Sequence, residues 1–120
     1  MATFAKTILS GSTDGKAIRI ANTSTPGTTI HTGSTNTAVL HEVWLYAQNT
    51  DATARKLTVE WGGTTVPDDL IELTVPAESG LVLVSPGLLI KGAASALVIR
   101  AFTTAIANVV TIHGFVNTIS

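Results

Sequence analysis

The sequence predicts an all-β fold, an antiparallel β-sandwich of about eight or nine strands. Threonine makes up a sixth of the 120 residues, and Val, Ile and Leu are abundant, a composition typical of pleated sheet. Clusters of Gly, Pro, Asn, Asp and Ser recur roughly every 8–12 residues, the spacing expected of a sandwich or barrel. No window long enough for a helix keeps an apolar period of 3.6 residues.

The first third of the chain differs in composition from the remainder. Residues 1–36 are richer in Ser, Thr and Gly and poorer in large apolar side chains. We predict that they form a looser N-terminal arm or an edge-strand region, with Ile18 and Ile20 sharing one strand face. Residues 37–120 are predicted to form the β-sandwich core, and the chain length suits one domain overall.

The segment 37–48 is apolar on both sides of a predicted strand. One side carries Val39, His41, Val43, Leu45 and Ala47, and the other carries Leu40, Glu42, Trp44, Tyr46 and Gln48. A strand of this kind is either central in a closed sandwich or covered by a partner subunit, because antiparallel sheets usually leave one face to water. We predict that Leu40, Trp44 and Tyr46 form a packing or interface strip. The segment 81–84 repeats the pattern.

The later strands alternate apolar and polar residues, which predicts one buried face and one solvated face. Their apolar sets are Leu57, Val59 and Trp61, then Ile71, Leu73 and Val75, then Leu97, Ile99 and Ala101. A break is expected at Ser85-Pro86-Gly87, and the last strand should run from about Val109 to Ile119.

Charge and hydropathy exclude several function classes. The net charge is −1, only 12% of residues are charged, and no basic stripe exists, so a nucleic-acid partner is not expected. Cysteine is absent, and the N-terminus does not have the pattern of a signal peptide. The apolar run 81–90 is too short to cross a membrane. The mean hydropathy of +0.41 is high for a small soluble domain. A neutral but hydrated surface rich in Thr and Ala is one explanation, and the other, which we predict, is a surface partly buried in a homo-oligomer.

The candidate catalytic and metal-binding residues do not form a recognisable site. No His-x-His pair occurs among His31, His41 and His113, and the adjacent His41 and Glu42 should point to opposite faces of a strand. No Gly-x-Ser-x-Gly elbow is present. Asp68-Asp69 is interpreted as part of a turn, with a surface calcium site as the alternative. We therefore predict no enzyme activity, no cofactor and no metal.

Several segments together resemble a known group of proteins. They are His41–Thr50, Leu57–Gly63, Pro67–Ile71, Pro76–Gly80, Leu97–Phe102 and Ile112–Asn117. In their order and their mixture of residue types, these segments resemble small virion proteins of tailed bacteriophages, of the capsid decoration (cement) type. The resemblance covers residues 39–119 and depends on no single diagnostic motif.

The resemblance implies a jelly-roll-like sandwich that binds the outside of the capsid and stabilises the shell, often as a trimer. The implied partners are further copies of the chain and the major capsid protein. The implied location is the capsid surface of the virion, after synthesis in the host cytoplasm. A tail or head-fibre component is an alternative. A carbohydrate-binding β-sandwich module is another, because Trp44, Tyr46 and Trp61 could stack on sugar rings.

Overall fold

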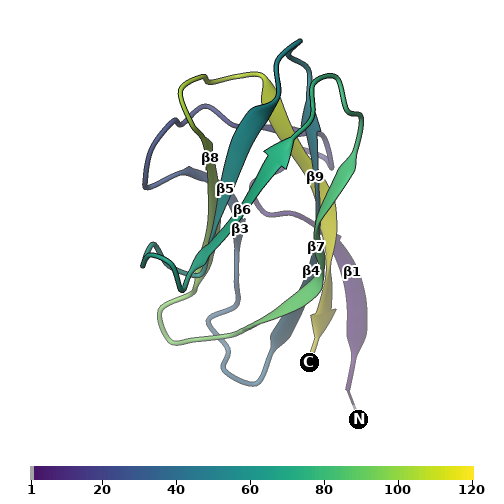
Figure 1. Ribbon diagram of the computed structural model, residues 1–120. Coiled ribbons are helices and arrows are strands. Elements are labelled where there is room, and N and C mark those ends of the chain that lie inside the picture. Colours follow the sequence, from purple (N-terminus) through teal and green to yellow (C-terminus); the bar gives the residue numbers. More distant parts are fainter. Residues whose placement is uncertain (1) are drawn as a thin grey trace.

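The computed structural model describes residues 2–120, and these residues form nine strands and no helix (Figure 1). The strands are β1 (Phe4–Ile8), β2 (Ile18–Arg19), β3 (Thr28–Thr32), β4 (Leu40–Asn49), β5 (Arg55–Trp61), β6 (Leu70–Val75), β7 (Val82–Lys91), β8 (Val98–Thr103) and β9 (Val110–Ile119). The predicted all-β class and strand number are confirmed.

The strands form two antiparallel sheets that face each other (Figure 1). Sheet A has the order β1-β9-β4-β7, and the short strand β2 also pairs with β9. Sheet B has the order β3-β8-β5-β6. Strands β4 and β9 lie in the middle of sheet A, with β1 and β7 as its edges.

Apolar side chains from both sheets fill the space between them. They include Val43, Leu45 and Ala47 of β4, Leu57 and Val59 of β5, and Ile99 and Ala101 of β8, all about 1% exposed or less. Trp61, Ile71 and Leu73 are partly buried and pack against this core. The alternation predicted the core-facing side of β5, β6 and β8 correctly.

Strand β5 departs from the prediction on its other side. Thr58 and Glu60 were expected to face solvent, yet each is only 1% exposed. Glu60 accepts hydrogen bonds from the Gly27 backbone N–H, at 2.7 Å, and from the Thr25 hydroxyl, at 2.5 Å. The half-buried interpretation of β5 is therefore wrong, because the segment between β2 and β3 covers Glu60 on that side.

Strand β7 differs from the prediction in a second way. Pro86 and Gly87 were expected to interrupt the strand, but they lie inside β7. The pairing of β7 with β4 shifts register between Val43 and Trp44, which marks a β-bulge at this place. An edge strand accommodates proline there, because its N–H side can face away from the neighbouring strand.

The N-terminal region contributes strands to both sheets. Strands β1, β2 and β3 all fall within residues 1–36, and Leu9, Ile20 and Ile30 from this region are buried in the core. Strands β1 and β3 are edge strands. Residue 1 lies outside the described residues. The division at residue 36 stays a prediction.

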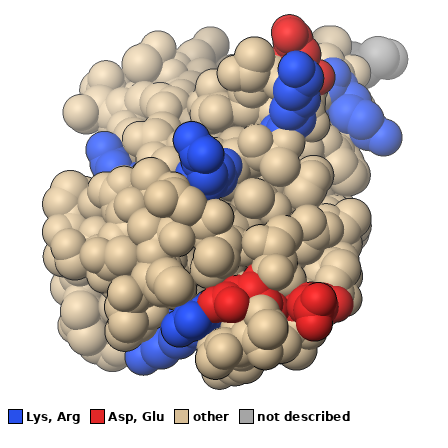
Figure 2. All heavy atoms as spheres, turned by 90° about the horizontal axis from the view of Figure 1, so that it is seen from above, with Lys and Arg blue, Asp and Glu red and all other residues tan. Residues whose placement is uncertain are grey.

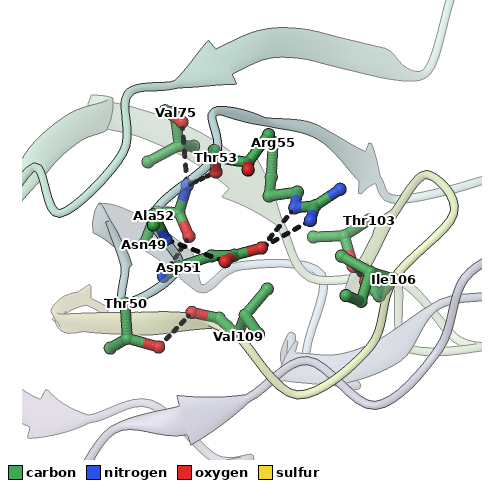
Figure 3. A network of polar contacts seen from close by, with 10 residues as sticks. All are labelled: Asn49, Thr50, Asp51, Ala52, Thr53, Arg55, Val75, Thr103, Ile106 and Val109. Carbon is green, nitrogen blue, oxygen red and sulfur yellow. Dashed lines mark hydrogen bonds and ion pairs between the residues drawn. The ribbon is translucent and has the colours of Figure 1, made fainter.

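A hydrogen-bonded turn organises the connection from β4 to β5 (Figure 3). The buried Asn49 amide donates to the carbonyl oxygens of Thr53, at 2.9 Å, and Val75, at 3.2 Å. Its side-chain oxygen accepts the Asp51 N–H, and Asp51 pairs with Arg55. These bonds connect the end of β4 in sheet A to β6 in sheet B.

Candidate interaction surface

The side of sheet A that faces away from the core carries mostly apolar side chains. Along β4, the core-facing residues Val43, Leu45 and Ala47 are fully buried. Side chains alternate along a strand, so the even-numbered Leu40, Trp44 and Tyr46 face outward, and they are half-buried. The predicted strip thus lies on the outer side of a central strand. Whether another molecule covers it stays a prediction.

The register of the strand pairs shows that residues of β1, β7 and β9 lie on the same side. Directly opposed residues of an antiparallel pair share one face. Ile119 and Phe115 of β9 oppose Leu40 and Trp44, and Phe4 and Ile8 of β1 oppose these two β9 residues. On the β7 side, Leu83 opposes Tyr46, and Leu89 opposes Glu42.

We call this set the apolar outer face. Its members are Phe4, Ile8, Leu40, Trp44, Tyr46, Leu83, Leu89, Phe115 and Ile119. Phe4 is 70% exposed and Leu89 is 53% exposed. From strand spacings, the outer side of sheet A covers roughly 550 Å² in projection. The apolar outer face makes up part of this area, and apolar patches of a few hundred Å² on a monomer are often functional surfaces.

Trp44 is held in one position at the centre of the apolar outer face. Its ring stacks on Phe115 of β9, with 6.0 Å between ring centroids and 12° between planes. On the β7 side, Gly87 lies against the indole, and a Cβ there would come within 3.0 Å of two ring carbons. Lys6 Nζ of β1 lies over the Phe115 ring, at 4.9 Å from its centroid. A row of contacts therefore crosses all four strands.

A small polar cluster lies beside the rings. Glu42 Oε1 accepts hydrogen bonds from Trp44 Nε1 and from Asn117 Nδ2, both at 2.8 Å. The bond from Trp44, followed by that from Asn117, lowers the pKa of Glu42 below its ordinary value. A carboxylate with these partners fixes the indole orientation. It also places a negative charge on the side of sheet A that carries Lys6.

Charge is sparse over the molecule. Seen from above, most of the surface belongs to uncharged residues, with only scattered Lys, Arg, Asp and Glu (Figure 2). Both ion pairs of residues 2–120, Arg55–Asp51 and Lys56–Glu72, are at least partly exposed to solvent. Exposed pairs contribute about 1 kcal/mol or less to stability. Apolar burial and hydrogen bonds, more than ion pairs, therefore hold the sandwich together.

Two of the three histidines lie close together. His31 and His41 meet inside the sandwich, where His31 Nε2 and His41 Nδ1 are 2.9 Å apart. His113 lies on the outer side of β9, opposite Tyr46. His41 and Glu42 do point to opposite faces, as predicted. The meeting of His31 and His41 was missed, because they come from different sheets and no spacing rule connects them.

Other chemistry-bearing residues play local roles. Asp69 accepts the Thr65 backbone N–H at 3.0 Å within the turn that the sequence predicted. Within residues 2–120, no group of three or more His, Asp or Glu side chains lies close enough to hold a metal ion. No pocket is found in this part of the chain. No helix of the described chain has the length and hydropathy needed to cross a membrane.

The sequence prediction found three of the nine residues of the apolar outer face. The pattern Phe4-x-Lys6-x-Ile8 and the position of Phe115 in the last strand carried a signal of the same kind. That signal was not read as part of one surface, because the order of strands in sheet A is needed to bring β1, β9, β4 and β7 together. The chain matches no family model, no curated protein and no solved structure.

Proposed function

We propose that this chain is a non-enzymatic structural protein of a tailed-phage virion, a capsid decoration protein. It binds the outer capsid surface as a homo-oligomer, with a trimer as the expected state, and stabilises the shell. The observation that carries the proposal is the apolar outer face of sheet A. The family resemblance over residues 39–119 supplies the virion context.

The proposed sandwich is of the jelly-roll type. Strand pairing supports this form, because the antiparallel pairs β1–β9, β3–β8, β4–β7 and β5–β6 are nested in the chain. Successive pairs alternate between sheet A and sheet B, as expected when one long hairpin is rolled into two facing sheets. Many virion proteins use this form, but it does not define a function by itself.

In the proposal, the apolar outer face is buried against further copies of the same chain. The whole outer side of sheet A, roughly 550 Å² in projection with its polar residues included, approaches the ~800 Å² per partner of a stable protein interface, and the relief of the side chains adds to the area that can be buried. Sheet faces also pack well on each other, at about 10 Å between sheets.

The charge distribution favours a second copy as the occupant. A partner of strong charge is not selected, because this side carries both the positive Lys6 and the negative Glu42, and few other charges. The rigid Trp44–Phe115 pair is the sort of preordered aromatic anchor that is enriched at interface centres. The other surfaces of the oligomer are left to contact the capsid, where many copies give avidity.

The carbohydrate-binding alternative has less support. Sugar rings stack on an open aromatic face, but Trp44 is covered by Phe115 on one side and lies against Gly87 on the other. Trp61 packs against the core. The polar groups beside the rings, Glu42 and Asn117, are already bonded within the protein.

The first experiment is the solution mass by light scattering after size exclusion. A mass three times that of the 12.4 kDa chain is expected. Trp44→Ala should lower either the oligomer mass or the thermal stability. A monomer at all concentrations, or a Trp44→Ala variant unchanged in both properties, would contradict the role of the apolar outer face.

The virion context needs a separate experiment. Particles of the phage whose genome encodes the chain are purified and their proteins are quantified by mass spectrometry. Many copies per particle, released together with a loss of shell stability, are expected for a decoration protein. A few copies that remain with isolated tails would support the tail or fibre alternative instead.

A further inference from the structure

A chain of hydrogen bonds joins the N-terminal segment, sheet B and sheet A. The Ser10 backbone N–H donates to His31 Nδ1 at 3.0 Å, and His31 Nε2 lies 2.9 Å from His41 Nδ1. His31 is in β3 of sheet B and His41 is in β4 of sheet A. The Thr32 N–H also donates to the Ser10 hydroxyl, at 2.7 Å. Ser10, which follows β1 closely in the chain, thus forms two hydrogen bonds with β3.

The direction of these bonds assigns the protons. Because Ser10 N–H donates to His31 Nδ1, that nitrogen carries no proton, and neutral His31 has its proton on Nε2. His31 Nε2–H then donates to His41 Nδ1, so neutral His41 has its proton on Nε2. The chain is complete only when both rings are uncharged.

Either added proton breaks one bond of the chain. A proton on His41 goes to Nδ1, where it faces the Nε2–H of His31, and two donors then oppose each other. A proton on His31 goes to Nδ1 and displaces the Ser10 N–H. The two positive rings would also repel each other, since their centroids are 5.1 Å apart.

No nearby carboxylate offsets such a charge. On the neighbouring strands, His31 is opposite Ile99, and His41 is opposite Ile90 and Thr118, none of which titrates. Glu42 and Lys91 are the nearest charged residues along β4 and β7, but both lie on the outer side of sheet A. Within the described residues, the titratable group facing each ring is therefore the other histidine.

We propose that the Ser10–His31–His41 chain is a proton-sensitive lock, which joins the two sheets and the N-terminal segment at neutral pH and opens on acidification. Burial, together with the His41 ring, lowers the pKa of His31 to about 4, and burial lowers the pKa of His41. The lock is thus closed at neutral pH. Opening weakens the attachment of the segment that follows β1. Strand β1 itself carries Phe4 and Ile8 of the apolar outer face. The inference does not depend on the proposed virion role.

Nitrogen-detected NMR of the full chain tests the lock directly. At about pH 7, both histidines should be neutral with the proton on Nε2. On acidification, the protection factors of the Ser10 and Thr32 amides against exchange should fall relative to those of β5 amides. His31 with its proton on Nδ1 would overturn the inference. So would ordinary titration of both rings near pH 6.5, or uniform exchange across the chain.

A variant pair provides an independent test. The unmodified chain is expected to lose roughly 10 °C in Tm between about pH 7 and pH 4.5. Gln at position 41 can accept the His31 Nε2–H bond but cannot be protonated, so His41→Gln should show a smaller fall, while the buried His31 keeps its own contribution. His113→Gln, outside the lock, should keep the whole fall. Equal acid sensitivity of both variants would overturn the proposal. If His41→Gln does not fold, the NMR titration of the unmodified chain decides.

Discussion

At the scale of single residues, Glu60 shows how a buried charge organises a loop. Its side chain is 1% exposed, and it accepts the Gly27 N–H and the Thr25 hydroxyl. Hydrogen bonds to a charged group contribute about 1.5–3 kcal/mol each, and donors left without a partner in a buried place are costly. Glu60 therefore fixes the segment between β2 and β3 on the side of sheet B away from the core.

Replacing this carboxylate should be strongly destabilising. Glu60→Leu is expected to lower the free energy of unfolding by about 3 kcal/mol, because two donors lose their acceptor. Urea denaturation followed by fluorescence of the two tryptophans measures the change. The control is Glu72→Leu on the neighbouring strand β6. It removes the exposed pair with Lys56 and a long hydrogen bond of 3.4 Å from the Thr58 hydroxyl, and should cost only about 1 kcal/mol. Equal losses in the two variants would contradict this role.

At the scale of elements, the pairing of β4 with β9 depends on one glycine. Gly114 has φ of 157°, and a Cβ at this position would overlap the carbonyl oxygen of Trp44 across the strand pair. Backbone atoms cannot move aside as a flexible side chain can. The absence of a Cβ is what allows the two central strands of sheet A to approach each other here.

Gly114→Ala should therefore separate β4 from β9 locally. We expect a loss of about 3 kcal/mol or more in unfolding free energy, or failure to fold. Gly80→Ala is the control, since a Cβ there meets nothing within 4 Å and only the φ of 67° opposes it. Its expected cost is about 1 kcal/mol. Thermal melts of the two variants, compared with the unmodified chain, check the difference.

At the scale of the whole molecule, both sides of sheet A are apolar while only one is covered by sheet B. If the outer side is a contact between copies, Leu89→Lys should reduce the oligomer mass measured by light scattering while the circular dichroism spectrum stays that of a β protein. Val66→Lys is the matched control, because Val66 is 74% exposed and lies in the turn before β6. An unchanged mass in both variants would exclude this edge of the apolar outer face from the contact.

Stability of the whole fold should also depend on pH through His31. Its pKa is 6.5 when unfolded and about 4 when folded, so the unfolded chain binds more protons between these values. The unfolding free energy therefore rises with pH across this window and falls on acidification. The full contribution is about 3 kcal/mol. Denaturant titrations at a series of pH values measure it. Glu42 and Asp51, with lowered pKa values, lose their contributions only at lower pH.

Sequence patterns alone were enough to predict the all-β class, the segments of β4, β5, β6, β8 and β9, and the core-facing side of most of them, but not the continuous strand β7. These follow from local rules, because the alternation of apolar residues has the period of a strand and turn residues mark where strands end. The strip of Leu40, Trp44 and Tyr46 was visible for the same reason, since it lies along one strand.

The neighbours of each strand became known only from the folded arrangement, and three features depend on them. Phe4, Leu89 and Phe115 join Trp44 in one surface because β1 and β7 flank the central pair. Glu60 is buried because a distant loop covers it, and His31 reaches His41 because the two sheets face each other. Such contacts join residues far apart in the chain, so no local pattern encodes them, and chain topology and packing determine them.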